Sequence, residues 1–246
     1  NRYMFFISNI NSNMIKGYMV HLYTTTGIVL GILAVRQIYE QNLDFVFMYL
    51  AISLFIDGTD GYLARKYNVL KYASRINGVI LDAIVDFFNY VIVPVLVIIQ
   101  FDFVPLSLEY ISASLILCAS CFTFANTKQK TKDNYFEGFP ALWNVLILDF
   151  YIINTSQIIN LFLIISCVVL TFVPIKFVHP LRVESYKLLA ILSFILWGLS
   201  TALLLFVFQD NSIEYKFGYY TWIVANIFIM LFSVFRTINK SFNINS

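Results

Sequence analysis

The sequence predicts an all-α, polytopic integral membrane protein with about eight transmembrane helices. Hydrophobic residues make up 60% of the 246-residue chain and charged residues only 12%, and the mean hydropathy is +0.78. Such a composition leaves little room for a soluble fold. Apolar windows of about 20 residues, the length that crosses a bilayer, recur along the whole chain and are separated by polar segments.

The windows can be placed in order along the chain. Residues 1–17 are amphipathic at best, and we expect them to form an interfacial segment. The predicted spans follow at about 18–37, 43–62, 78–99, 108–126, 139–155, 158–177, 187–208 and 217–236. No internal repeat or low-complexity segment divides the chain, so we interpret residues 1–246 as a single transmembrane catalytic domain.

The distribution of basic residues orients these spans. If both termini are cytoplasmic, only Arg36 and Lys216 of the 16 basic residues fall on the outer side. The positive-inside rule therefore favours cytoplasmic termini, an even number of spans and a cytoplasmic loop between spans two and three. The net charge is only +2, and no basic cluster interleaves with aromatic residues, so nucleic acid is not an expected partner.

Four aspartates lie in two pairs inside otherwise apolar sequence. Asp57 and Asp60 come near the end of span two, and Asp82 and Asp86 near the start of span three. Spacings of three and four residues place each pair on one helix face. At a rise of 1.5 Å per residue, both pairs lie roughly 6 to 12 Å from the connecting loop. We therefore expect the carboxylates to meet at one depth, close to the cytoplasmic surface.

These carboxylates need a cationic partner, because each costs about 2.5 to 3.5 kcal/mol within a membrane. An all-oxygen set favours Mg²⁺ or Mn²⁺ over zinc or copper. Two such ions about 4 Å apart would assist displacement at phosphorus. Arg65 suits a phosphate group, and the small residues Gly61 and Gly78 leave the nearby backbone open to a ligand. The pattern thus indicates a diphosphate substrate.

Two other interpretations stay open at this point. The aspartates could form structural ion pairs with Arg65, Lys66 and Arg75. They could instead line the pathway of a cation transporter, where intramembrane carboxylates are also common. The outer halves of spans two and three are almost entirely apolar, which disfavours a polar route across the membrane.

The order of these residues resembles a known signature. Asp57-x-x-Asp60-Gly61-x-x-Ala64-Arg65, followed by Gly78-x-x-x-Asp82-x-x-x-Asp86, is similar to the motif of the CDP-alcohol phosphotransferases, integral membrane enzymes that move a phosphatidyl or similar group from CMP to an alcohol. Twelve residues separate Arg65 from Gly78, where most of the family has about eight or nine. This longer spacer, Gly58 and the stretches LARKYNV, GFPALWN and FVHPLRV resemble the bacterial phosphatidylcholine synthase branch.

The resemblance implies a helical bundle like that of the family and transfer of a phosphatidyl group from CDP-diacylglycerol to choline, with release of CMP. It also implies Mn²⁺ or Mg²⁺, with two ions expected, a homodimer among membrane lipids, and a cytoplasmic active site in a bacterial inner membrane. The nearest alternative keeps this chemistry with serine, glycerol 3-phosphate or inositol phosphate as acceptor. Cation transport is the remote alternative.

The resemblance also implies roles for individual residues. The expected metal ligands are Asp57, Asp60, Asp82 and Asp86. Asp86 would also be the general base, with Asp82 beside it as a second catalytic residue. The expected CDP contacts are Asp57, Gly61, Ala64, Arg65 and Gly78, together with His21 and Thr24 of span one.

Choline must be recognised by residue type, because a quaternary ammonium group cannot donate hydrogen bonds and is held by aromatic faces and carboxylates. The candidates are Asn89, Tyr90, Tyr135, Glu137 and Trp143. With 16 Tyr, 25 Phe and 3 Trp in the chain, a given aromatic residue more often serves packing or an interfacial belt. No role is assigned to His179, Arg182 or Asp149.

Overall fold

A computed structural model of the chain describes residues 12–126, 136–177, 187–207 and 212–242. The chain divides into two compact units, residues 1–97 and 98–246. The elements of the first unit are α2 (Ser12–Tyr39), α3 (Leu43–Lys66), α4 (Val69–Tyr72), α5 (Gly78–Phe87), η1 (Phe88–Ile92) and the start of α6 (Val93–Gln100).

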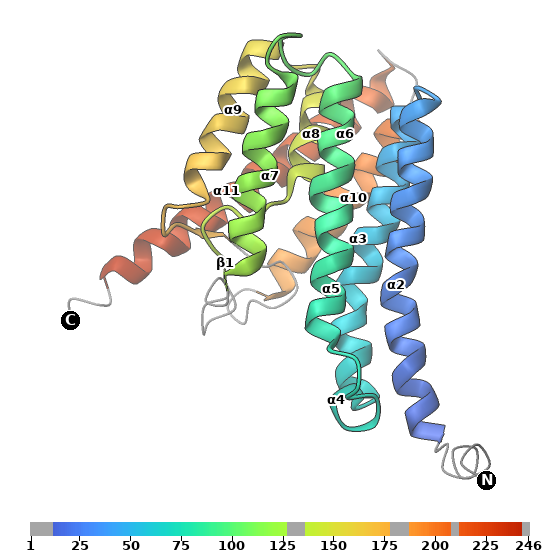
Figure 1. The fold of residues 1–246 in the computed structure, drawn as a ribbon. Helices are drawn as coiled ribbons and strands as arrows, with labels where there is room; N and C mark the ends of the chain where they lie inside the picture. Colours follow the sequence, from blue (N-terminus) through green and yellow to red (C-terminus); the bar gives the residue numbers. More distant parts are fainter. Residues whose placement is uncertain (1–11, 127–135, 178–186, 208–211, 243–246) are drawn as a thin grey trace. The chain divides into compact units, whose positions relative to one another are not determined.

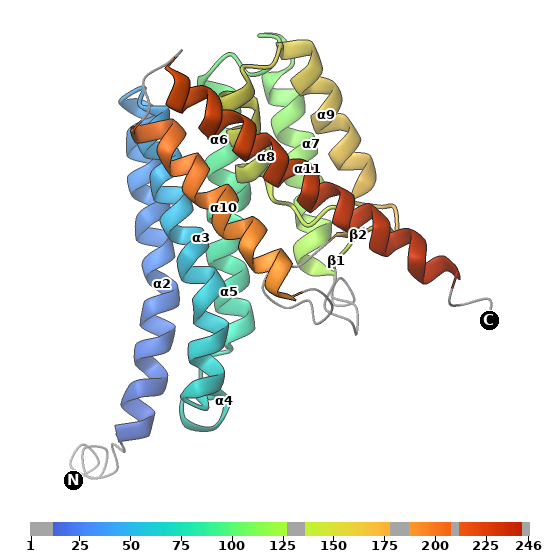
Figure 2. The ribbon, with the colours of Figure 1, turned by 180° about the vertical axis from the view of Figure 1, so that it is seen from behind.

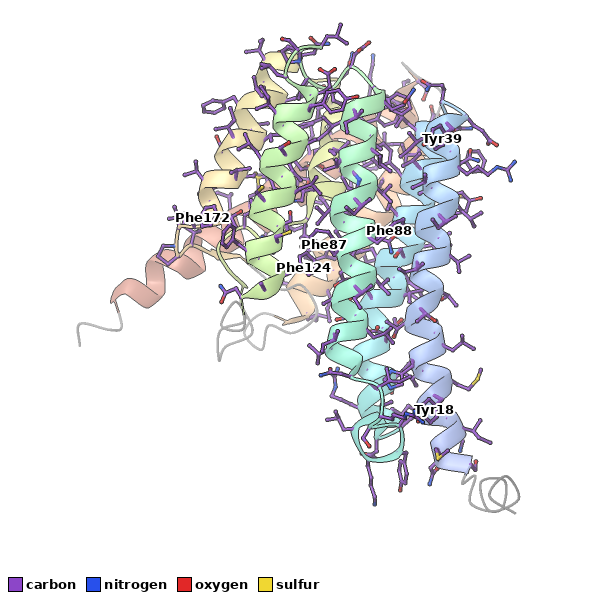
Figure 3. All side chains as sticks on the ribbon, viewed as in Figure 1. Tyr18, Tyr39, Phe87, Phe88, Phe124 and Phe172 are labelled. Atoms are coloured by element: carbon purple, nitrogen blue, oxygen red, sulfur yellow. The ribbon has the colours of Figure 1, made fainter. Side chains whose placement is uncertain are left out.

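Helix α2 packs along α3 and α5, as both ribbon views show (Figures 1 and 2). Tyr39 is the last residue of this helix, and Tyr18 lies in its first half (Figure 3). Its buried residues recur at helical spacing and are mostly small, which lets the helices approach closely. They are Gly17, Val20, His21, Thr24, Gly27, Gly31, Ala34 and Ile38. On α3, Val46, Phe47 and Leu50 are buried, and each stabilises the packing by roughly 1.5 to 3 kcal/mol.

The helix that begins at α5 contains a wider turn at η1. Pro94 has no backbone N–H, so a regular α-helix would leave the carbonyl of residue 90 without its usual donor. The chain forms a π-helical turn here, in which the Val93 N–H donates to the Phe88 carbonyl. Such turns hold one additional residue and change the direction in which the neighbouring side chains point. Asn89 and Tyr90 lie on this turn.

Asparagine side chains fix the starts of two helices in the first unit. Asn42 precedes α3 and accepts a hydrogen bond from the Phe45 N–H. Asn77 precedes α5 and accepts from the N–H groups of Val79 and Ile80. Because asparagine at this position satisfies the first unpaired N–H groups of a helix, α5 begins at Gly78.

The second unit contains mostly helices and one short pair of strands. Its remaining elements are α7 (Glu109–Ala125), β1 (Phe136–Glu137), α8 (Trp143–Ile153), α9 (Gln157–Leu170), β2 (Lys176–Phe177), α10 (Lys187–Phe206) and α11 (Ile213–Phe242). The two strands pair in antiparallel register, with Phe136 opposite Phe177. Helices α10 and α11 pack against each other (Figure 2).

Gly138, directly after β1, has a φ of +83°, and a Cβ there would collide with the Thr171 carbonyl oxygen. Only glycine combines this backbone conformation with so close an approach. The N–H of Phe139 donates to the Leu170 carbonyl at 3.1 Å and so satisfies the end of α9. The stretch GFPALWN therefore leads from β1 to α8 and contacts the end of α9 where it begins.

The predicted helical character of the chain is confirmed, and each predicted span contains a helix. Within the described residues, two segments are long and apolar enough to cross a bilayer: α2, and the stretch Gly78–Gln100 that joins α5, η1 and α6. Helix α3 has a similar length, but its second half carries Asp57, Asp60, Arg65 and Lys66. Four shorter apolar helices follow, within α7, α8, α9 and α10. The count of eight spans stays a prediction.

Candidate functional site

Three of the four aspartates come together in the first unit. Asp57 extends from α3, and Asp82 and Asp86 from consecutive turns of α5. Each offers one carboxylate oxygen, and these oxygens all lie within 4.8 Å of one another. All three side chains are half-buried. The spacing of the aspartates predicted that carboxylates of α3 and α5 would lie close together, and for these three residues they do.

The chemistry of this group fits a hard divalent cation. Carboxylate oxygens are the donors that Mg²⁺ and Mn²⁺ favour, and ligand distances of about 2.0 to 2.2 Å place the oxygens around one ion some 3 to 4 Å apart. A separation within 4.8 Å therefore needs only small side-chain adjustments to close around an ion. Because like charges at this separation repel, a cation is also what the group requires electrostatically.

Asp60, the fourth predicted ligand, is not part of this group of three. It follows Asp57 by three residues, which rotates its direction by about 60° around the helix. Its carboxylate is buried and accepts a hydrogen bond of 2.7 Å from the Thr24 hydroxyl of α2. The structure thus joins Thr24 to the motif through Asp60. Metal ligation by Asp60 stays a prediction.

Asn89 and Tyr90, two predicted choline contacts, lie beside the aspartates and are both buried. The Tyr90 hydroxyl donates to Asp57 Oδ2 at 2.9 Å. The Asn89 amide donates to the Gly27 carbonyl at 3.0 Å and to the Ser53 hydroxyl at 2.7 Å. The Tyr90 hydroxyl and the Asn89 amide nitrogen therefore have partners within the first unit, whereas Asn89 Oδ1 is buried without a hydrogen-bond partner among the described residues.

The predicted CDP contacts lie where α3 ends and α5 begins. Gly61 and Ala64 are half-buried in the last turns of α3, and Arg65 is exposed. Gly78 opens α5, and a Cβ at Gly78 would lie 3.4 Å from His21 Cε1. The His21 ring is buried, with Nε2 3.3 Å from the Ala73 carbonyl oxygen. The structure therefore brings His21 next to Gly78, one turn of α2 away from Thr24 and Asp60.

The other sequence candidates belong to the second unit. Trp143 is fully buried, and its indole N–H donates to the Ser120 hydroxyl at 2.8 Å. Glu137 lies in β1, where only its backbone is described, and Asp149 is half-buried in α8. The candidate Tyr135 falls outside the described residues, as do His179 and Arg182, to which no role was assigned.

Sequence reasoning missed some polar residues that hold the first unit together. Ser53 bonds Asn89, and Tyr23 and Thr59 share a hydrogen bond of 2.8 Å between their hydroxyls. Asn77, which caps α5, was missed as well. For Ser53 and Asn77 the sequence contained a signal. Ser53 precedes Asp57 by four residues and so shares its helix face, and Asn77 stands directly before a predicted span.

Comparisons with known proteins identify the family to which the chain is similar. Residues 19–173 match the family model described as CDP-alcohol phosphatidyltransferase. The chain is 32% identical over 230 residues to a phosphatidylcholine synthase of Pseudomonas aeruginosa, which covers 94% of this chain and 95% of that protein. It is 34% identical over 181 residues to a phosphatidylcholine synthase of Borreliella burgdorferi, with 74% and 77% covered. The resemblance that the motif indicated is thereby confirmed.

Proposed function

Because the chain belongs to the CDP-alcohol phosphatidyltransferase family, we propose that it is a phosphatidylcholine synthase. It transfers the phosphatidyl group of CDP-diacylglycerol to choline and releases CMP. The observation that carries this proposal is the meeting of Asp57, Asp82 and Asp86 within the family motif. The names of the relatives in Pseudomonas aeruginosa and Borreliella burgdorferi support choline as the acceptor.

The carboxylates of Asp57, Asp82 and Asp86 would hold Mn²⁺ or Mg²⁺, with Asp60 completing the set if two ions bind. A divalent ion held there would neutralise charge on the diphosphate and would stabilise the attacking and leaving oxygens. The exposed Arg65 guanidinium donates to the diphosphate, because its planar N–H groups match phosphate oxygens. Gly61, Ala64 and Gly78 leave room beside them for the nucleotide, with His21 and Thr24 close by.

Asp86 acts as the general base in this proposal. It takes the proton of the choline hydroxyl as the hydroxyl oxygen forms a bond to the phosphatidyl phosphorus. The bond from that phosphorus to the CMP oxygen breaks, and CMP leaves. Asp82, one turn earlier on α5, keeps the local charge negative, which favours binding of both a metal ion and the choline ammonium group. The predicted choline contact Glu137 remains a proposal, whereas we assign the buried Trp143, which bonds Ser120, to the packing of its unit.

The finer features of the architecture belong to the same proposal. We propose eight spans in a bacterial inner membrane, with both termini and the active site on the cytoplasmic side. The distribution of basic residues supports this orientation. A cytoplasmic site suits the substrates, since choline and the CDP group come from water and the acyl chains stay in the lipid. The enzyme works as a homodimer, with residues 1–246 as one catalytic domain.

The proposal is tested by CMP release from purified protein in detergent with CDP-diacylglycerol and Mn²⁺. Choline, serine, glycerol 3-phosphate and inositol 1-phosphate are compared as acceptors. We expect release with choline alone and its loss on removal of the divalent ion. Release driven by another acceptor would keep the family chemistry but overturn choline as the substrate. No release with any acceptor, in protein that still binds CDP-diacylglycerol, would overturn the transferase proposal.

A further inference from the structure

Two neighbouring side chains on the π-helical turn connect the aspartate group to the interior of the first unit. Tyr90 donates a hydrogen bond of 2.9 Å to Asp57 Oδ2. Asn89 precedes it and bonds the Gly27 carbonyl of α2 and the Ser53 hydroxyl of α3. Neither residue belongs to the aspartate motif. Both are almost completely buried, at 4% and 0% exposure, and so are fixed in place by their surroundings.

The position of Asn89 depends on two glycines of α2. A Cβ at Gly31 would collide with Asn89 Oδ1 and would lie 2.6 Å from the Phe88 ring. A Cβ at Gly27 would lie 2.7 Å from Val85 Cγ1 and 3.6 Å from Asn89 Nδ2. Because real Cβ atoms do not approach other atoms so closely, the π-helical turn can pack this closely against α2 only where α2 carries these glycines. Asn89 then joins α2, α3 and the π-helical turn through one amide group.

The position of Tyr90 follows from that of Asn89. The two residues are consecutive on a turn that is widened beside Pro94, so the fixed amide of Asn89 also fixes the direction of the Tyr90 ring. Its hydroxyl then meets one oxygen of Asp57 and restricts rotation of that carboxylate. The orientation of a metal ligand is commonly set by such a hydrogen bond from a second residue.

We propose that Tyr90 is a positioning residue for the metal site, which holds the Asp57 carboxylate toward Asp82 and Asp86, and that Asn89 anchors the turn carrying Tyr90. This inference rests on the proposed function. In this inference the Tyr90 hydroxyl serves to orient the Asp57 carboxylate. The aromatic ring of Tyr90 is not required to contact the substrate. The metal ion, and not choline, is therefore the ligand whose binding depends on this hydroxyl.

The test uses Tyr90→Phe, which removes the hydroxyl and keeps the ring. The matched control is Tyr23→Phe, which removes a tyrosine hydroxyl of the same unit whose bond in the described part of the chain is to the Thr59 hydroxyl. Binding of Mn²⁺ to each purified protein is measured by electron paramagnetic resonance of the free ion, without substrate. The concentration of Mn²⁺ that supports half-maximal CMP release is measured in parallel.

We expect Tyr90→Phe to weaken Mn²⁺ binding about 10-fold and to require about 10-fold more Mn²⁺ for activity, as other residues that orient metal ligands do. The KM for choline at saturating Mn²⁺ should stay within about twofold, because the ring is retained. Tyr23→Phe should bind Mn²⁺ like the wild type. Thermal unfolding of both variants shows whether the substitutions affect folding equally.

Wild-type Mn²⁺ binding by Tyr90→Phe would overturn the inference while leaving the proposed function intact. A raised KM for choline with unchanged Mn²⁺ binding would also overturn it, in favour of direct choline contact. If the wild-type protein itself neither binds Mn²⁺ nor needs a divalent ion, the metal site of the proposed function fails and the inference fails with it.

Discussion

The two units of the chain use buried polar side chains differently. In residues 1–97, two of the hydrogen bonds between elements lead to carboxylates, since Thr24 donates to Asp60 and Tyr90 donates to Asp57. Others in this unit, such as those of Asn89, lead to a hydroxyl and a backbone carbonyl. In residues 98–246, the corresponding bonds lead to hydroxyls and backbone carbonyls, as in Trp143 to Ser120 and Asn160 to Phe103. Bonds of the first kind orient anionic groups, whereas bonds of the second kind hold helices and loops in place.

This difference teaches that the function of a buried polar residue is indicated by its hydrogen-bond partner and not by its residue type. Trp143 and Tyr90 were both predicted to contact choline, because both are aromatic. Trp143 donates to a serine within the packing of its unit, while Tyr90 donates to a member of the aspartate group. We therefore expect the chemistry to depend on the first unit and the stability of the fold to depend on both.

Of the substitutions that test this difference between the units, Asp86→Asn is expected to have the largest effect on the rate of CMP release. Asparagine keeps the size of the side chain but cannot accept the proton of the choline hydroxyl. Loss of a general base lowers the rate of CMP release by about 10² to 10⁴-fold. Asp44→Asn, near the start of the adjacent helix α3, is the matched control. More than about a tenth of the wild-type rate in the Asp86 variant would exclude Asp86 as the base.

A smaller effect is expected for Thr24→Val, which removes the hydrogen bond to Asp60 and preserves the shape of the side chain. Activity should fall about 10-fold, and Thr24→Ser should restore most of it, because serine supplies the same donor. The matched control is Thr26→Val, since the exposed Thr26 hydroxyl bonds only a carbonyl of its own helix in the described structure. Equal activities of the two valine variants would show that the bond to Asp60 has no part in catalysis.

Trp143→Phe tests whether a buried polar contact of the second unit contributes to stability and not to choline binding. This substitution removes the bond to Ser120 and leaves space in a fully buried position, so the free energy of unfolding should fall by about 2 kcal/mol. We expect the KM for choline to change by less than about twofold. A large rise in this KM without loss of thermal stability would instead assign Trp143 to the choline site.

The smallest effect is expected at the exposed end of α2, where Arg36 donates to Glu40 at 2.8 Å. This hydrogen bond, with a further one from Gln37, lowers the pKa of the Glu40 carboxyl below its ordinary value. The ionised carboxylate therefore stabilises the fold at neutral pH, and this contribution is lost as the pH falls through the lowered pKa.

Glu40→Gln should reduce the thermal midpoint slightly at pH 7, and this difference from the wild type should disappear as the pH falls through the lowered pKa of the Glu40 carboxyl. Activity should be unchanged. A difference in thermal midpoint that grows toward acid pH would contradict the assigned pairing.

Much of the architecture could be predicted from the sequence, because long apolar windows and the polar segments between them dictate where helices begin and end. The meeting of Asp57 with Asp82 and Asp86 was predictable as well. Both pairs lie close to one connecting loop, and their spacing fixes the helix face. The exact extent of α8 could not be predicted from the sequence, since the helix Trp143–Ile153 is shorter than the apolar window 139–155.

The sequence could not reveal the contacts that depend on helix rotation and packing. The partner of Asp60 is Thr24, which lies 36 residues away on α2. The π-helical turn at Phe88–Ile92 depends on how Asn89 fits against Gly27 and Gly31, and Pro94 alone only disfavours a regular helix. Such features arise from tertiary packing, for which no local pattern of residues is a guide.

The central claim is that Asp57, Asp82 and Asp86 form one metal site. It is tested most directly by measuring Mn²⁺ binding to the purified protein, without substrate, for the wild type and for Asp57→Asn, Asp82→Asn, Asp86→Asn and the control Asp44→Asn. We predict that each of the first three variants weakens Mn²⁺ binding at least about 10-fold, whereas Asp44→Asn binds like the wild type. Equal Mn²⁺ binding by all five proteins would contradict the account.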